Sequence, residues 1–304
     1  MASDIGGVPV PPANTSAPID LDEPAALDAP DRDRVLALAA AAAARDGEPP
    51  LSDQALSRLS SSAVRHLVAR ASGEVIGYLQ LDGSAAEVVG DGAALTSLLD
   101  AAESRSSDGL VVWSHGERSV VAPVVQGRRY RPVRVLHQLH RDMSEPVPEL
   151  ALADGVTVRD FVPGQDDEAW LAVNAAAFAG HPEQGRWTRA DLTAREREPW
   201  FDPHGFLIAE RGGHMIGFHW TKVHGDGAGE VYVLGVHPDA QGLGLGPALL
   251  TRGLQRLAER GCPTVLLYVD DDNAGAMRLY ERFGFSHSDT DTQWQSPTRT
   301  NPTG

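Results

Sequence analysis

A glycine-rich turn within residues 229–250 has the residue types needed to bind a phosphate group. Residues 230–236 alternate as in a β-strand, and from Leu243 apolar residues recur at helical spacing, so the turn joins a strand to the start of a helix. The first N–H groups of a helix have no partner within it, and glycines let a phosphate approach them. The turn is therefore predicted to bind a pyrophosphate. Its glycines are Gly242, Gly244 and Gly246.

Two common phosphate-binding loops do not fit this stretch. It lacks the Gly-Lys-Ser/Thr ending of a nucleoside-triphosphate P-loop, and its glycines are not spaced as in the dinucleotide fingerprint. It does contain Gln-x-x-Gly-x-Gly, at Gln241, Gly244 and Gly246, preceded by Val-x-Pro. This motif resembles the loop with which GNAT N-acetyltransferases bind the pyrophosphate of acetyl-CoA. An ordinary glycine-rich turn is the alternative.

A short helix predicted over residues 274–283 carries two further candidates. It follows a strand-like segment, 264–269, and is closed by Gly284. Asn273 and Tyr280 are seven residues apart and so lie on one helix face. In the GNAT pattern this face meets the pantetheine arm of the cofactor, with the tyrosine beside the thioester sulfur. The alternatives are that Asn273 only caps the helix and that Tyr280 only fills the core.

Composition restricts the class of protein and its partners. The 304 residues suffice for two domains, and the formal net charge of −16 argues against nucleic acid as a partner. No apolar run is long enough to cross a bilayer, and the first 30 residues lack the features of a secretory signal. The single cysteine, Cys262, is expected to be buried and fits a reducing compartment. We expect a cytoplasmic monomer that acts on small molecules, with no membrane contact and no metal site.

The chain repeats a pattern at a spacing of 140 residues. A hairpin-like segment, 66–78, matches 206–218, since both contain Leu-x-Ala followed by Ile-Gly-aromatic at identical offsets. An acidic residue then leads into valines in each half, Glu87 in the first and Glu230 in the second. The pattern predicts a duplicated domain. Two unrelated hairpins with similar turns are the alternative.

Only the second half carries the motifs. After Val89 there is no Gln-x-x-Gly-x-Gly and no turn long enough for one, and segment 117–126, where a counterpart of Tyr280 would fall, has no tyrosine. We therefore expect the first half to be catalytically silent. Periodicity predicts helices over 31–44, 52–60, 166–179 and 188–197, strands near 205–211, 214–223 and 229–236, and a final strand pair after the last helix.

The predicted fold class is α/β (α+β), with two tandem GNAT domains, each a mixed central sheet flanked by helices. The predicted divisions are a flexible leader 1–30, a degenerate N-terminal GNAT domain 31–142, a linker 143–154, a catalytic C-terminal GNAT domain 155–295 and a flexible tail 296–304.

Longer stretches resemble one tandem-GNAT family, the mycothiol synthases (mycothiol acetyltransferases). The matching stretches of the second half are 174–185, 200–203, 217–224 and 229–236, and the first half matches more loosely through 46–53. The resemblance implies transfer of acetyl from acetyl-CoA to the cysteinyl amine of desacetylmycothiol, a conjugate of cysteine, glucosamine and inositol.

The resemblance also implies which residues contact each substrate. The implied acceptor contacts are Asp53, Glu183, Lys222, Glu230 and Tyr268. The implied acetyl-CoA contacts are Leu234, Gly235, Val236, Gln241, Gly242, Leu243, Gly244, Leu245, Gly246, Pro247, Asn273, Ala274, Gly275, Ala276, Met277 and Arg278. For Lys222 a surface lysine is the alternative.

Chemistry assigns catalytic roles to two residues. An amine attacks a thioester only when unprotonated, so a carboxylate must accept its proton, and Glu230 lies on the strand that delivers the acetyl group. The departing thiolate, with a pKa of about 8.5, can regain a proton from a neighbouring phenol, Tyr280. Simple alternation places Glu230, Tyr232 and Leu234 on one strand face, where base and acyl group would meet. The alternative for Glu230 is a solvated edge carboxylate.

Two other functions remain open from the sequence. One is a GNAT enzyme for another amine, such as an aminoglycoside or a peptide N-terminus, because the cofactor motif does not distinguish acceptors. The other is a non-catalytic CoA-sensing protein, against which the intact Tyr280 argues.

Overall fold

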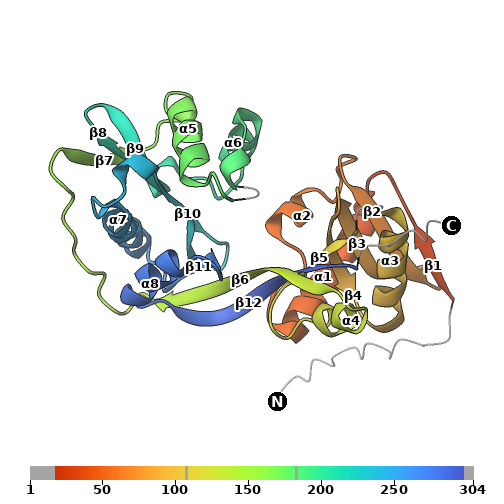
Figure 1. The fold of residues 1–304 in the computed structure, drawn as a ribbon. Coiled ribbons are helices and arrows are strands. Elements are labelled where there is room, and N and C mark those ends of the chain that lie inside the picture. The colour runs from red at the N-terminus through yellow and green to blue at the C-terminus, as the bar shows by residue number, and fades with distance from the viewer. Residues whose placement is uncertain (1–17, 107–108, 182–183, 298–304) are drawn as a thin grey trace, which may run out of the picture. The chain divides into compact units, whose positions relative to one another are not determined.

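In the computed structural model of the chain, the described residues are 18–106, 109–181 and 184–297, and they divide into two compact units (Figure 1). Unit 1 runs to Val135 and resumes at Asp291, and unit 2 is Leu136–Thr290. In each unit a sheet lies between helices on its two faces. This is the predicted three-layer arrangement. None of the helices in the described part of the chain combines the length and apolarity that a bilayer crossing requires.

The strands of unit 1 follow the order β1-β2-β3-β4-β5-β12. Side chains of β3 alternate between two cores: Tyr78 packs under α1 and α2, and Leu79 packs under α3. The strands are β1 Ile19–Asp22, β2 Arg65–Ala71, β3 Glu74–Asp82, β4 Ala85–Gly90 and β5 Val111–Ser114, and the helices are α1 Ala29–Asp46, α2 Asp53–Ser57, α3 Gly92–Arg105 and α4 Val121–Gly127. The last strand, β12, is Ser286–Gln295.

The strands of unit 2 follow the order β6-β11-β10-β9-β8-β7. They are β6 Arg131–Asp142, β7 Val156–Asp160, β8 Phe206–Arg211, β9 His214–Val223, β10 Gly229–Val236 and β11 Thr264–Asp270. The helices are α5 Asp167–Ala177, α6 Arg189–Glu196, α7 Leu245–Glu259 and α8 Ala274–Arg282, with single 3-10 turns at Gln184–Arg186, Pro203–Gly205 and Pro238–Ala240.

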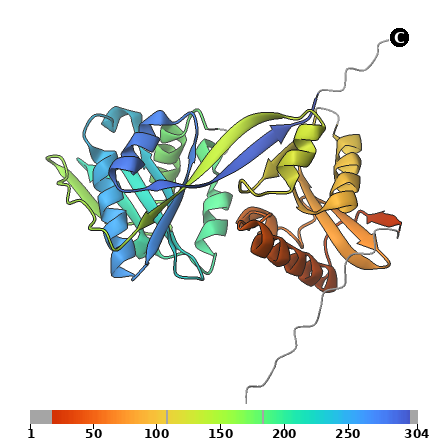
Figure 2. The ribbon, with the colours of Figure 1, turned by 90° about the horizontal axis from the view of Figure 1, so that it is seen from below.

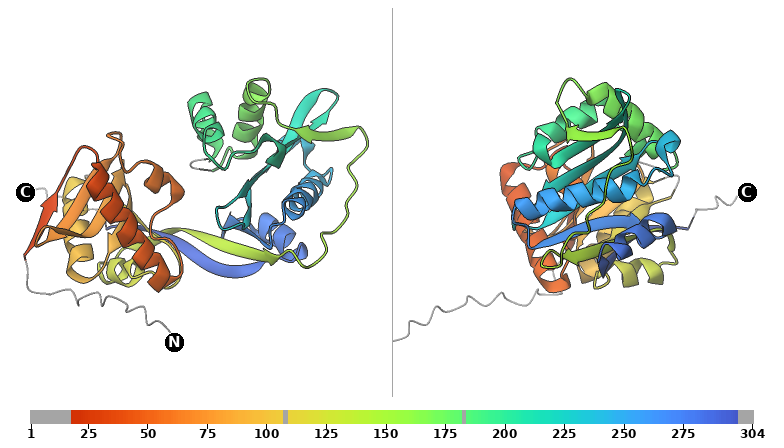
Figure 3. Two further views of the ribbon diagram at one scale, coloured as in Figure 1. Left: turned by 180° about the vertical axis from the view of Figure 1, so that it is seen from behind. Right: turned by 90° about the vertical axis from the view of Figure 1, so that its left-hand side faces the viewer.

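Two cores cover the two faces of the unit 2 sheet. Under α5 and α6 the core is aromatic, and the Trp220 ring stacks on Phe206 with centroids 4.3 Å apart. The helices α7 and α8 cover the other face of the sheet (Figure 3). The core beneath them is aliphatic and includes Leu250 and Leu267. Cys262 is buried in this second core, as predicted.

The final strand pair predicted for the second half is wrong. Among the described residues only one strand, β12, follows α8. Instead β6, which follows α4, pairs antiparallel with β11, and β12 pairs antiparallel with β5. β6 and β12 are neighbours in the strand order, and Figure 2 shows them side by side. The division between the units therefore falls within β6 and β12, not in the proposed linker 143–154. Either strand satisfies the backbone of β5 or β11, so local sequence does not choose between them.

Part of the predicted leader is folded. β1 pairs with β2, with Ile19 opposite Ala71, and α1 begins at Ala29 behind an Asp28 cap. In the predicted tail, the Ser296 N–H donates to the Leu110 carbonyl at 2.8 Å. The remainder of the leader and of the tail, residues 1–17 and 298–304, lies outside the described residues.

The two hairpins support the duplication but correct the alignment of the acidic residues. Bulges fall at matching places, after Ala69 in one hairpin and after Ala209 in the other. Glu87, however, pairs with Gln80, whose counterpart 140 residues later is Trp220, and Trp220 pairs with Val233. Glu87 therefore occupies the position of Val233, not that of Glu230.

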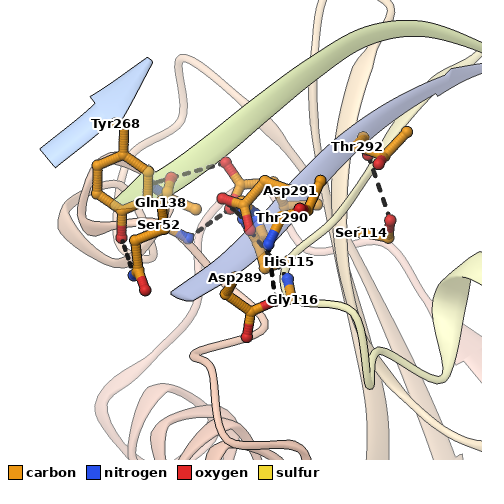
Figure 4. A network of polar contacts seen from close by, with 12 residues as sticks. Ser52, Ser114, His115, Gly116, Gln138, Tyr268, Asp289, Thr290, Asp291 and Thr292 are labelled. Atoms are coloured by element: carbon orange, nitrogen blue, oxygen red, sulfur yellow. Dashed lines mark hydrogen bonds and ion pairs between the residues drawn. The ribbon is translucent and has the colours of Figure 1, made fainter. Parts of the chain in front are cut away.

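A partly buried ion cluster joins β4, β5 and β12 within unit 1. His115 Nδ1 lies 2.9 Å from Asp291 Oδ2, and His115 Nε2 lies 3.5 Å from Glu87 Oε2. Gly116 N–H donates to Asp291 (Figure 4). Burial by itself would lower the pKa of His115, but the hydrogen bonds and charges of Asp291 and Glu87 outweigh it and raise the pKa to about 10. His115 is therefore a cation at neutral pH.

The pairing of β12 with β5 predicts the effect of Trp294→Ala. Trp294 is buried in the core of unit 1, so its loss should cost about 3–5 kcal/mol of stability. Hydrogen–deuterium exchange should then speed up in β5 and β12. The exposed neighbour Gln295→Ala is the control. Faster exchange in β11, with β5 unchanged, would contradict the pairing.

The ion cluster predicts a pH-dependent stability. Because the folded-state pKa of His115 lies above its unfolded value of about 6.5, its stabilisation is complete below that pH and is lost as pH rises through about 10. His115→Gln should lower the free energy of unfolding by about 3 kcal/mol at about pH 6. Urea unfolding should show this difference shrinking toward about pH 10, while the exposed His214→Gln shows no such trend. A difference that is constant with pH would refute the assignment.

Candidate active site

The glycine turn lies between β10 and α7, as predicted. Gly244 is the N-terminal cap of α7 with a φ of +66°, in the left-handed region, and no side chain caps this helix. The first N–H groups of α7 therefore point out of the helix without a capping side chain. A Cβ at Gly244 would meet no described atom within 4 Å, so the surface over the turn is open. The turn has the form of an anion site.

The start of α7 meets the end of β10 and the helix α8. A Cβ built on Gly246 would lie 4.0 Å from both Val236 Cγ2 and Leu279 Cδ2. The proposed cofactor segments of β10, the turn and α8 are therefore neighbours in unit 2.

At Gly235 a Cβ would lie 2.7 Å from the Phe218 ring, so only glycine fits between β10 and β9 there.

β10 and β11 pair over only a short length and then part. Their parallel register covers Gly229 with Val265 and Glu230 with Leu266, although β10 continues to Val236 and β11 to Asp270. The backbone of β10 beyond Glu230 therefore has no β11 partner among the described residues. An extended chain with amide groups can hydrogen-bond there in place of a strand.

A β-bulge at Tyr232 changes which side chains share a face. Val231 pairs with Thr221 but Val233 pairs with Trp220, so one extra residue lies on β10. Paired residues point to the same face, and the parity of the strand therefore reverses at the bulge.

The predicted common face of Glu230, Tyr232 and Leu234 is wrong for Leu234. Glu230 and Tyr232 lie on the face of α5 and α6, where Tyr232 contacts the ring of Trp200 at 5.0 Å. Leu234 lies on the face of α7 and packs against its core. Because of the bulge, the Glu230 carboxylate and the helix α7 lie on opposite faces of the sheet. Between β10 and β11, beyond their two paired residues, the sheet is open from one face to the other.

Glu230 is the centre of a buried polar cluster. Its side chain is 9% exposed, and Oε2 lies 2.7 Å from His224 Nε2 and 3.8 Å from Lys222 Nζ. Lys222, 7% exposed, also has its ammonium 5.2 Å from the centre of the Trp200 ring. Neither residue is the solvated surface group that was the alternative reading from sequence.

Tyr268 lies on the same sheet face as Glu230, because Glu230 pairs with Leu266 and strand alternation adds Tyr268. It is 42% exposed, and its hydroxyl accepts a hydrogen bond from Gln138 Nε2 at 3.0 Å (Figure 4). Lys222, Glu230 and Tyr268, predicted from separate stretches, are therefore brought to one face. Gln138 was missed because β6 belongs by sequence to the first half.

Tyr280 is buried in the core between α7 and α8. Its ring makes an edge contact with Phe285, with centroids 5.7 Å apart, and it is 8% exposed. Burial raises the pKa of Tyr280 to about 12. The phenol is therefore protonated at neutral pH and has a proton that it can donate.

The remaining predicted residues lie outside the Glu230 cluster or outside the described residues. Asn273 caps α8, with Oδ1 accepting from Ala276 N–H at 3.1 Å, as the simpler reading held. Ala274, Gly275 and Arg278 are exposed on the first turns of α8. Asp53 is exposed at the first position of α2, in unit 1. Glu183 lies outside the described residues.

Unit 1 has the matching framework but a much shorter turn between its strand and helix. β4 and β5 also pair over two residues, Ala85 with Val111 and Ala86 with Val112. Beyond them, however, Glu87 and His115 form an ion pair from one strand to the end of the other. Between β4 and α3 there is only Asp91, where the turn before α7 spans 237–244. This agrees with the short turn expected from sequence.

His224 was missed as a functional residue. From the sequence, His224 is assigned no role. The alternation of the 214–236 hairpin could have indicated it. Lys222 lies directly opposite Glu230, and His224, two residues further on, lies on the same face and diagonal to Glu230.

The fold and the glycine turn define a GNAT acetyltransferase. Residues 172–285 match the model of the acetyltransferase (GNAT) family. A tandem GNAT protein from the clavulanic acid biosynthesis pathway superposes with a TM-score of 0.70, covering 93% of this chain and 100% of that chain at 17% identity. A GCN5-related N-acetyltransferase from Sphaerobacter thermophilus gives 0.68, with 92% and 96% covered at 23% identity. At these identities the likenesses establish the fold.

Sequence relatives give the family within that class. A mycothiol acetyltransferase from Thermomonospora curvata is 49% identical over 283 residues, covering 88% of this chain and 94% of the relative. One from Streptomyces avermitilis is 48% identical over 295 residues, covering 90% and 94%. The chain belongs to the mycothiol acetyltransferase family. It is an N-acetyltransferase that uses acetyl-CoA.

The left-handed conformation of Gly244 predicts the effect of Gly244→Ala. A Cβ in this conformation costs about 1 kcal/mol, which should displace the turn and weaken CoA binding about fivefold by calorimetry. Gly213→Ala is the matched control, because Gly213 has a φ of +79° in an exposed turn before β9. Equal CoA affinity in both variants would show that the turn does not hold the diphosphate.

Proposed function

We propose that the chain transfers the acetyl group of acetyl-CoA to the cysteinyl amine of desacetylmycothiol. Membership of the family, and the name of relatives that cover most of the chain, support this acceptor. The observation that carries the proposal is the buried Glu230 carboxylate, held by Lys222 and His224 where β10 and β11 part.

The cofactor lies along the gap between β10 and β11 in this proposal. Its diphosphate binds the N–H groups at the start of α7, and its pantetheine arm hydrogen-bonds to the β10 backbone beyond Glu230. Backbone N–H groups of residues 234–236 then polarise the thioester carbonyl and stabilise the oxyanion that forms on attack. The exposed residues of the first turns of α8 complete the cofactor site.

The acceptor lies on the α5 and α6 face of the sheet. The Glu230 carboxylate attracts its ammonium group, which is the group to be acetylated. Lys222 and the phenol of Tyr268, which is 42% exposed, offer hydrogen-bond donors for sugar and inositol hydroxyls. Asp53 and Glu183 remain proposed acceptor contacts.

The reaction needs two proton movements. Glu230 removes a proton from the ammonium, and the resulting amine attacks the thioester carbon, forming the N–C bond. The C–S bond then breaks with its electron pair passing to sulfur. The protonated phenol of Tyr280 donates to the developing thiolate, and the second proton of the amine replaces the phenol proton. The products are the amide and CoA thiol.

We also propose that the enzyme works as a monomer in the cytoplasm. A single, buried cysteine supports a reducing compartment.

The proposed base predicts the effect of Glu230→Gln. The amide cannot accept the ammonium proton, so kcat should fall by roughly 10²–10⁴-fold. Acetyl-CoA affinity should stay within about twofold, because the turn before α7 is untouched. The exposed Glu281→Gln on α8 is the control. Wild-type turnover by Glu230→Gln would eliminate it as the base.

The proposed acceptor is tested by thiol release from acetyl-CoA with a panel of amines. Desacetylmycothiol should give a kcat/KM at least about 100-fold above an aminoglycoside or a peptide N-terminus, a discrimination typical of sites that hydrogen-bond their substrate. Preferred turnover of another amine would contradict the acceptor.

Tyr280→Phe should lower kcat for the preferred amine about tenfold, because the thiolate loses its donor.

A further inference from the structure

His224 contacts Glu230 but takes part in no proton movement of the proposed transfer. It lies in the turn between β9 and β10, where its N–H donates to the Ala228 carbonyl at 2.8 Å and its own carbonyl accepts from Gly227 N–H at 3.0 Å. The backbone at His224 is thus fixed by the turn. Its ring reaches Glu230 diagonally across the hairpin, with Nε2 at 2.7 Å from Oε2.

The three members of the Glu230 cluster differ in their access to water. The side chains of Glu230 and Lys222 are 9% and 7% exposed, whereas that of His224 is 29% exposed. A proton taken by Glu230 has a direct hydrogen-bonded route to His224, and from His224 to solvent. The Lys222 ammonium nitrogen lies 3.8 Å from Glu230 Oε2. An ammonium group has no lone pair with which to bind another proton, so Lys222 stabilises the carboxylate but does not accept its proton.

The stoichiometry of acetyl transfer requires such a route. An ammonium acceptor and acetyl-CoA give an amide, CoA thiol and one proton. The proton that Glu230 removes from the ammonium is the one released, because the second amine proton replaces the proton that Tyr280 gives to sulfur. Unless it leaves, Glu230 stays protonated and cannot serve the next turnover.

We propose that His224 is the proton-relay residue that passes the acceptor's proton from Glu230 to water. The neutral imidazole, protonated at Nδ1, accepts the proton at Nε2, which restores the Glu230 carboxylate. The imidazolium then releases its Nδ1 proton to solvent, and proton exchange with water returns the ring to the Nδ1-protonated tautomer for the next turnover. No oxidant, reductant or further reactant is needed. The inference rests on the proposed role of Glu230. It extends that role from accepting the proton to regenerating the base.

A purely structural role for His224 is the competing explanation, since its Nε2 also orients the carboxylate. The two are separated by His224→Gln, whose side-chain N–H can still donate to Glu230 but cannot take up and release a proton. Lys222 on β9 lies within ion-pair distance of Glu230, and Asp226 lies in the same turn as His224 and accepts a hydrogen bond from Ala228 N–H.

The experiment measures kcat with desacetylmycothiol for the wild type, His224→Gln, His224→Ala and the control His204→Gln. His204 is also paired with a carboxylate, Asp160, at 2.7 Å, but on the 3-10 turn before β8. We expect both His224 variants to lose about tenfold in kcat, less than the roughly 10²–10⁴-fold typical of a group that contacts the reacting atoms. KM for acetyl-CoA and the activity of His204→Gln should not change.

Added imidazole provides the readout that a structural role would not move. It should restore His224→Ala toward the wild-type rate, with the size of the rescue following the basicity of substituted imidazoles. Full activity of His224→Gln, or a folded, acetyl-CoA-binding His224→Ala that imidazole does not rescue, would overturn the relay. An inactive wild type would instead overturn the proposed acceptor, and with it the relay for that acceptor.

Discussion

The parting of β10 from β11 after Glu230 is the constraint on which the site depends. Two paired residues hold the strands together, and beyond them the β10 backbone has no β11 partner among the described residues. Unsatisfied backbone groups in a sheet interior are costly unless something else bonds to them. The gap therefore amounts to a preformed place for an extended, amide-containing ligand, and the glycine turn before α7 stands at its end.

The bulge at Tyr232 decides which side chains lie on each face of the sheet beside this gap. Without it, Glu230 and Leu234 would share a face. With the extra residue, Glu230 lies on the face opposite to Leu234, together with Lys222, His224 and Tyr268. In the proposed reaction, acceptor and cofactor therefore approach the same gap from opposite sides of one sheet.

Unit 1 shows what the same framework becomes without these features. Its strands β4 and β5 part at the equivalent point, but Glu87 and His115 form an ion pair beyond it. The register of β3 against β4 has no shift, and the turn before α3 is a single residue. Asp291, from the end of the chain, completes the ion cluster, so the C-terminal strand contributes to the stability of the first half.

Local sequence determined much of this protein. The glycine turn, both Ile-Gly hairpins, the Asn273 cap and the helices α5 to α8 follow from turn chemistry and periodicity, which act over a few residues. Family resemblance pointed to Lys222, Glu230 and Tyr268, and the structure brings these three to one face. The tertiary structure alone decided the parity of β10, the exchange of β6 and β12, and the pairing of Gln138 with Tyr268. Each of these depends on which distant strand satisfies a backbone, and every strand offers the same N–H and C=O groups whatever its sequence.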